Sequence, residues 1–136
     1  AFDHASERHK GHVTVPRGVH VRKLGKCMGM TVYRVDGEKI RRDIFIDFVF
    51  GGTGARYKFI PDKEIWLEQI MSPNDATATL LHEYVEYLKM TTGSHLSYEH
   101  AHDKASAAEV KLREKLARRK LRRVDLKMVE KLMGKH

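Results

Sequence analysis

The stretch that begins at Ser72, SPNDATATLLHEYVEYLKMTTG, carries the signals of a helix at both ends and constrains the fold more than any other part of the chain. Ser72 is a favourable N-cap and Pro73 suits the first turn of a helix. Asp75 stands three residues after the cap, close to the pattern of a capping box. Gly93 can end the helix in a left-handed conformation. We therefore predict a helix over residues 73–91.

Further helices are expected after this one. Ser97 can cap a second helix that runs from Tyr98 to about Lys120. Residues 124–133 continue that helix or form a third, short one. The connection over residues 92–97 is short enough for the two long helices to form an antiparallel pair.

Strands are expected before the first helix, because short β-prone runs alternate there with turn residues. Asp36-Gly37 predicts a tight hairpin turn. Residues 44–49 alternate with the period of two that is typical of a strand, and residues 51–54, Gly-Gly-Thr-Gly, indicate a flexible hairpin connection. Further short strands are predicted over 13–21, 56–60 and 64–68. The sequence thus predicts an α+β fold, with a largely antiparallel sheet of about four or five strands followed by two long helices.

Charge divides the chain into three parts. Residues 111–136 hold eleven Lys/Arg and three Asp/Glu, residues 1–30 hold six and two, and residues 31–110 hold nine and thirteen. We predict an acidic α+β core at 31–110, between a basic N-terminal arm with short strands and a basic helical C-terminal extension. Basic flanks attract nucleic acid, anionic membranes or acidic proteins, although they also simply aid solubility. The candidate polyanion-binding residues are Arg118, Arg119, Lys120, Arg122 and Arg123.

Several classes of protein are disfavoured by composition. No apolar run approaches the ~18–20 residues that span a bilayer, so no transmembrane segment is expected. The N-terminal residues are too polar for a secretory signal. The single cysteine, Cys27, cannot form an internal disulfide, which favours an intracellular setting. Any metal site would therefore use histidine, aspartate and glutamate ligands.

The helix that begins after Ser72 contains a pattern with metal-binding spacing. Its His-Glu-x-x-Glu run departs from the zinc-protease pattern His-Glu-x-x-His only at Glu86. His82 and Glu86 are four residues apart and share one helix face, so both can bind one ion. Glu83 is rotated by about 100° from His82, which allows it to act as a base beside the metal. The motif therefore offers two ligands and a base.

A third ligand is expected from the second helix. His102 and Glu109 lie on the apolar stripe that this helix turns toward the protein, with Ala105, Leu112 and Leu116. Buried ionisable groups are costly unless they are paired or bound to a metal. We predict a site of His82, Glu86 and His102, with Glu109 as a fourth ligand or as the group that orients a ligating histidine. The alternative is an ion pair between His82 and Glu86 without any metal.

A longer pattern surrounds this motif. A strand with Ile-Asp and a Gly-rich turn is followed by Ile-Trp, by Leu-Leu-His-Glu-x-x-Glu, and by Tyr-x-x-Ala-His-x-x-Ala-x-x-x-Glu. Over residues 43–109 the chain resembles a group of small phage and bacterial proteins, which are in turn similar to minimal zincin-type metallopeptidases. The residues that carry the resemblance are Asp47, Ile65, Trp66, His82, Glu83, Glu86, Tyr98, Ala101, His102 and Glu109.

The resemblance implies a zincin-like core in which His82, Glu86 and His102 hold a divalent metal, first of all zinc. Glu83 would be the general base of a small metal-dependent hydrolase, a zinc metallopeptidase acting on peptides. Residues 64–68 would form the strand alongside the cleft. The second glutamate makes the site more anionic, which would weaken Lewis acidity or favour another divalent ion.

A cytoplasmic or virion-associated location is expected for such a protein. The alternative function is a non-enzymatic nucleic-acid-binding or virion assembly module. In that case the helix pair is a scaffold and the basic flanks hold a polyanion.

Overall fold

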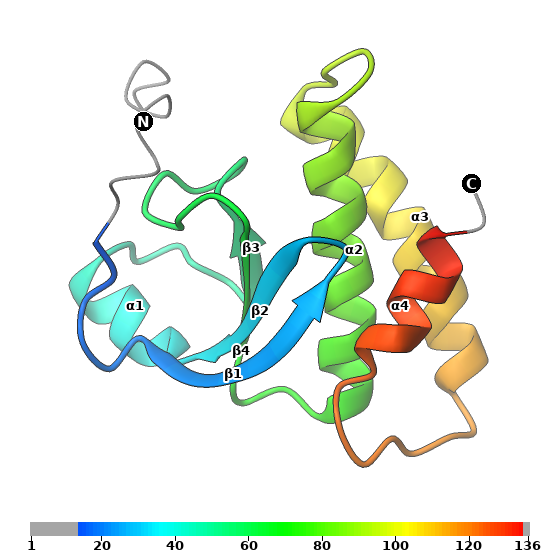
Figure 1. Ribbon diagram of the computed structural model, residues 1–136, viewed down its shortest axis with the longest axis horizontal. Coiled ribbons are helices and arrows are strands. Elements are labelled where there is room, and N and C mark those ends of the chain that lie inside the picture. The colour runs from blue at the N-terminus through cyan, green and yellow to red at the C-terminus, as the bar shows by residue number, and fades with distance from the viewer. Residues whose placement is uncertain (1–13, 135–136) are drawn as a thin grey trace.

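The computed structural model describes residues 14–134 and shows a sheet with helices packed against it (Figure 1). The predicted α+β class is confirmed. The described chain contains four strands and four helices: β1 (His20–Cys27), β2 (Met30–Val35), α1 (Gly37–Asp43), β3 (Gly51–Thr53), β4 (Glu64–Glu68), α2 (Pro73–Thr91), α3 (Tyr98–Leu116) and α4 (Leu126–Met133).

The sheet is mixed, with the strand order β1-β2-β4-β3. The pairs β1–β2 and β3–β4 are antiparallel, but β2 and β4 are parallel, with Val32 opposite Ile65 and Tyr33 opposite Trp66. The expectation of a largely antiparallel sheet is therefore wrong. The chain leaves β2 through α1, a loop and the edge strand β3 before it enters β4, and a crossover of that length allows β4 to run parallel to β2.

The Asp36-Gly37 pair begins a helix and does not form the predicted hairpin turn. The Asp36 side chain accepts a hydrogen bond from the backbone N–H of Lys39 at 2.9 Å and so caps α1. Gly37 is packed so closely against the Glu68 carboxylate that a Cβ atom would have no room there. The same acidic side chain that suits a turn also suits an N-cap, and here the cap prevails.

The predicted strands over 44–49 and 56–60 are turns and loops. Phe48 and Tyr57 of these segments are buried and pack with Trp66 of β4 in a second hydrophobic cluster, against which Phe45 and Phe59 pack partly buried. Gly51–Thr53, expected as a flexible connection, instead forms the edge strand β3 against β4. Of the segment 13–21, residue 13 lies outside the described part, and β1 begins only at His20.

The predicted helix over 73–91 is confirmed as α2. The Ser72 hydroxyl accepts from the Asp75 N–H at 3.1 Å, and Gly93 after the last turn has a φ of +59°. The second helix, α3, is capped by Ser97 as expected but ends at Leu116, and the third, α4, is separate from it. No described helix has the length and apolar character needed to cross a membrane.

The main hydrophobic cluster lies between the sheet and the three C-terminal helices. Val32, Ile65 and Leu67 of the sheet meet Leu80 of α2 in it, and Val129 of α4 is fully buried there. The predicted boundary at 110/111 falls inside α3. Of the helix pair, α2 packs against the sheet through β3 and β4, and α3 packs against α2 (Figure 1).

Candidate metal centre

Three ligand-type side chains meet where α2 and α3 face each other. His82 Nε2 lies 3.2 Å from Glu86 Oε2 and 3.2 Å from His102 Nδ1, and the latter two atoms are 3.1 Å apart. His82 and Glu86 are buried, and the His102 side chain is 43% exposed. The three atoms thus form a nearly equilateral triangle, and the structure brings together the three ligands predicted from the sequence.

The triangle has the size of one face of a tetrahedral metal site. Zinc bonds to nitrogen and oxygen are ~2.0–2.1 Å long, which places two ligands of a tetrahedron ~3.3 Å apart. Two histidines with one glutamate also make up a donor set that catalytic zinc sites use. The residues therefore fit a divalent metal, and Glu86 in place of a histidine keeps the site within a known class of ligand sets.

The same triangle is poorly suited to hydrogen bonding alone. Each imidazole nitrogen offers either one proton or one lone pair, so His82 Nε2 cannot serve both Glu86 and His102 as a donor. The three atoms make three short contacts, and the available protons cannot form a hydrogen bond along each of them. A single cation at the point on which the three atoms converge would satisfy all of them.

Glu109 contacts the opposite side of the His82 ring. Its Oε1 lies 2.9 Å from His82 Nδ1, and its Oε2 accepts from Arg113 Nε at 2.7 Å. The buried Nδ1 makes no aligned hydrogen bond in the described part of the chain, so the short contact is mainly electrostatic. Because Nδ1 and Nε2 point in different directions, this geometry favours the orienting role for Glu109 over that of a fourth ligand.

Arg113 of α3 binds Glu109 of the same helix and also joins α3 to α2. Its Nη1 donates to Asp75 Oδ1 of α2 at 2.6 Å while its Nε holds Glu109 of α3. The hydrogen bond from Arg113 is the main reason why the pKa of Asp75 is lowered. The ion pairs of Arg113 with Asp75 and Glu109 therefore hold the Glu109 carboxylate beside His82 Nδ1.

Glu83 is the second buried carboxyl group at the site. Burial raises its pKa to about 8, and the nearby Glu86 adds to the shift while His82 opposes it. For His82, burial disfavours the charged form, but the hydrogen bond to Glu86 and the surrounding carboxylates outweigh it, and the pKa of His82 is raised. Without a metal, the site therefore holds protons that a cation would replace.

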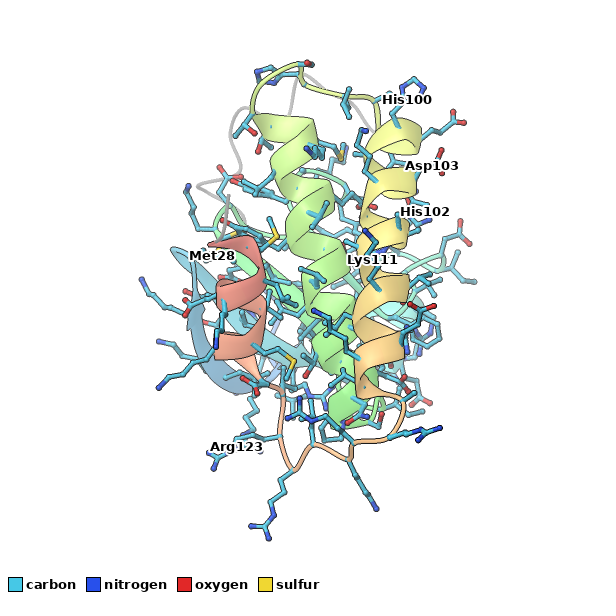
Figure 2. All side chains as sticks on the ribbon, turned by 90° about the vertical axis from the view of Figure 1, so that its right-hand side faces the viewer. Met28, His100, His102, Asp103, Lys111 and Arg123 are labelled. Atoms are coloured by element: carbon cyan, nitrogen blue, oxygen red, sulfur yellow. The ribbon has the colours of Figure 1, made fainter. Side chains whose placement is uncertain are left out.

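The cluster lies in a cleft of about 530 Å³. Its walls come from α2, α3, the loop 47–51 and residues 56–57, and both Glu83 and His102 line it. Figure 2 shows His102 on α3, with His100 and Asp103 nearby on the same helix. The strand beside the cleft is β3, through Gly51, and the expectation that 64–68 would lie there is wrong because β4 is an inner strand.

Arg56 is a cleft residue that the sequence pattern missed. Its guanidinium carbon lies 4.2 Å from the centre of the Tyr98 ring and 5.1 Å from that of Tyr57, and its buried Nε has no hydrogen-bond partner among the described residues. Its charge also lowers the pKa of Glu83. It was assigned to a strand, and no local signal marks it, because its position depends on a loop that folds over α2.

The five predicted polyanion-binding residues lie elsewhere. Arg118, Arg119, Lys120, Arg122 and Arg123 are all exposed in the connection between α3 and α4. Figure 2 shows this connection at the end of the helix pair that lies away from His100 and His102. The basic connection and the cleft are therefore separate parts of the surface.

Comparison of the chain with protein-family models, curated proteins and solved structures finds no match. The chemistry of the cleft is therefore inferred from its side chains and their arrangement.

Proposed function

We propose that the protein is a small zincin-like metal-dependent hydrolase that cleaves peptides, with zinc held by His82, Glu86 and His102. The observation that carries the proposal is the triangle of ligand atoms, 3.1–3.2 Å on each side, at the wall of an open cleft. Such an ion supplies a Lewis acid, which polarises a carbonyl group and lowers the pKa of water.

The chain's own residues would divide the remaining work. Glu83 lines the cleft beside the ligands. Burial raises its pKa to about 8 in the metal-free site, and a bound cation would shift Glu83 toward the carboxylate that can accept a proton from water. That property suits a group that first takes a proton and then delivers it to the leaving amine. Arg56, fixed between two tyrosine rings, is placed to offset negative charge that develops in the cleft.

The first test is the metal content of protein purified without an affinity tag, measured by elemental mass spectrometry. We expect about one equivalent of zinc or of another transition metal, reduced at least tenfold in His102→Ala because an open site with two ligands binds weakly. His100→Ala is the matched control, since His100 lies on the same helix outside the triangle. No metal in the purified protein and none after addition of zinc would contradict the proposal.

The second step separates binding from catalysis. Glu83→Gln should keep the metal and lose at least a hundredfold in the rate of cleavage of a peptide library, because proton transfer contributes about that much. An unchanged cleavage rate would show that Glu83 is no base. Metal binding without cleavage of any peptide would support the metal site and contradict the hydrolase activity.

A second candidate function is polyanion binding through the basic connection. The observation that favours it is the exposure of all five of its cations, none of which is paired with a carboxylate in the described chain. Phosphate groups need no sequence motif for contact with lysine and arginine. This function is compatible with the metal site, because the two surfaces are separate.

A further inference from the structure

An apolar groove of about 860 Å³ runs along a different face of the α2–α3 pair. Its floor is formed by Leu81, Val85 and Leu88 of α2 with Ala108 and Leu112 of α3. Met28, from the turn between β1 and β2, and the last turn of α4 also line the groove. The groove shares no lining residue with the metal cleft.

The rim of the groove is strongly positive. Four lysines line it, and no aspartate or glutamate does; the lysines are Lys89, Lys104, Lys111 and Lys115. None of the four forms an ion pair within residues 14–134. A smaller depression between α3 and α4 continues the groove past Lys115 and adds Arg119 and Lys131, again without an acidic residue. An occupant therefore meets cations along its whole length.

The shape and spacing of the groove fit a helix. On α2 the floor residues Leu81, Val85 and Leu88 repeat at helical spacing, and on α3 the rim extends from Lys104 to Lys115, a rise of ~17 Å or about three turns. The amphipathic helix α4 packs against α2 and β1, and its last turn borders the groove. Figure 2 shows α2 between α4 and α3, with Met28 near the upper end of α4 and Lys111 on α3.

We propose that this groove binds an acidic amphipathic helix of a partner protein. The apolar face of that helix would cover the floor, as in other helix-in-groove complexes, and its carboxylates would meet the lysines of the rim. Two methionine side chains of the lining, Met28 and Met133, adapt readily to different apolar partners. The interaction is independent of the metal site and of its proposed activity.

The distribution of charge favours this occupant over two others. A lipid or fatty acid carries its charge at one end, whereas the lysines are spread along the whole groove. Single-stranded nucleic acid uses aromatic side chains for stacking, and the only aromatic residue in the lining is Tyr84, which is buried. An elongated ligand with one apolar face and several carboxylates matches both the floor and the rim.

The test is a fluorescence anisotropy titration of the full chain with a labelled peptide of leucine, alanine and glutamate, about 14 residues long, whose leucines form one helical stripe. We expect binding that weakens at least about tenfold in the double variant K104E/K111E, because two attractions become repulsions. The matched control R122E/R123E makes the same change in net charge outside the groove and should alter affinity less than about twofold. Ala108→Phe, which fills the groove, should abolish binding while the Tm stays within a few degrees.

Several outcomes would overturn the proposal. One is no binding of the peptide, and another is equal loss of affinity in the two double variants, which would indicate unspecific charge attraction. Equal binding of a scrambled peptide without a leucine stripe would exclude recognition of a helix face. Loss of binding to phosphatidylglycerol vesicles in K104E/K111E, with no binding of the peptide, would assign the groove to an anionic lipid instead.

Discussion

At the residue scale, the carboxyl groups that would serve the metal site are buried, and their burial lowers the stability of the metal-free protein when they are ionised. Glu83 and Glu86 are two buried carboxyl groups on adjacent faces of α2, and His82 lies between them and Glu109. The ordinary pKa of a glutamate is 4.5, and that of Glu83 is raised to about 8. The folded metal-free protein therefore holds a proton that the unfolded chain releases, which makes its stability depend on pH.

The sign of this dependence leads to a prediction for Glu83→Gln in protein treated with a chelator. Below pH 4.5 Glu83 is protonated in both states, and its substitution by glutamine should not change the pH dependence. Between pH 4.5 and about 8 the native glutamate loses stability by up to ~1.4 kcal/mol per pH unit, while glutamine does not titrate. The variant should therefore gain a few kcal/mol relative to the native protein by pH 8.

The measurement is urea denaturation of both proteins at several pH values. Glu114→Gln, at an exposed position of α3, is the control and should show no such trend. A difference between native and Glu83→Gln protein that is the same at pH 4 and pH 8 would contradict the assigned environment of Glu83. Added zinc should reduce the stability that Glu83→Gln gains over the native protein, because a nearby cation favours the ionised form of Glu83.

At the scale of elements, α4 is an integral part of the core although it belongs to the most basic of the three parts of the chain, residues 111–136. Asp125 caps this helix by accepting from the Met128 N–H at 2.9 Å, and Glu130 accepts from the Met28 backbone N–H at 3.1 Å. Its apolar residues pack into the main cluster beside Cys27 of β1. A charge count along the sequence therefore does not separate this helix from the folded domain.

This packing predicts that Val129→Ala lowers the free energy of unfolding by about 1–2.5 kcal/mol, because it removes fully buried methyl groups. Val110→Ala is the matched control on α3, where the side chain is 55% exposed and the change should be within about 0.5 kcal/mol. Urea denaturation followed by circular dichroism measures both. Equal effects of the two substitutions would show that α4 does not contribute to the cooperative core.

At the scale of the whole molecule, charge is arranged by surface. The cleft collects carboxylates, and the groove collects lysines. The connection between α3 and α4 carries five exposed cations, of which Arg119 also lines the depression that continues the groove. The cleft and the groove share no lining residue, and the connection lies at one end of the helix pair (Figure 2). One small fold can therefore offer three binding surfaces of different chemistry.

Polyanion binding by the basic connection predicts a steep loss of affinity for single-stranded DNA as salt is raised. Each phosphate contact contributes about 0.7 to the slope of log K against log salt, so replacing the five cations by glutamine should flatten the slope by up to ~3.5. Anisotropy at several salt concentrations measures it. The groove variant K104E/K111E is the control, and an unchanged slope in the five-residue variant would exclude this surface.

Features of the fold that depend on neighbouring residues were predicted more accurately than features that depend on distant contacts. The caps at Ser72 and Ser97 and the stop at Gly93 were predicted correctly, because each depends on residues within one turn. Asp36-Gly37 was assigned to a hairpin because a turn and an N-cap use the same residue types. The alternation over 44–49 was mistaken for a strand because aromatic loop residues that cover a sheet also recur at short spacing.

By itself, the sequence determined the helix at 73–91, the start of the next helix after Ser97 and the placement of His82, Glu83 and Glu86 on the first of them, since helical spacing relates residues only four positions apart. Only the tertiary structure decided that β2 and β4 pair in parallel, that β3 borders the cleft and that Arg56 enters it. It also decided the lysine-rimmed groove. These features depend on contacts between segments far apart in the chain, and local residue patterns carry little information about such contacts.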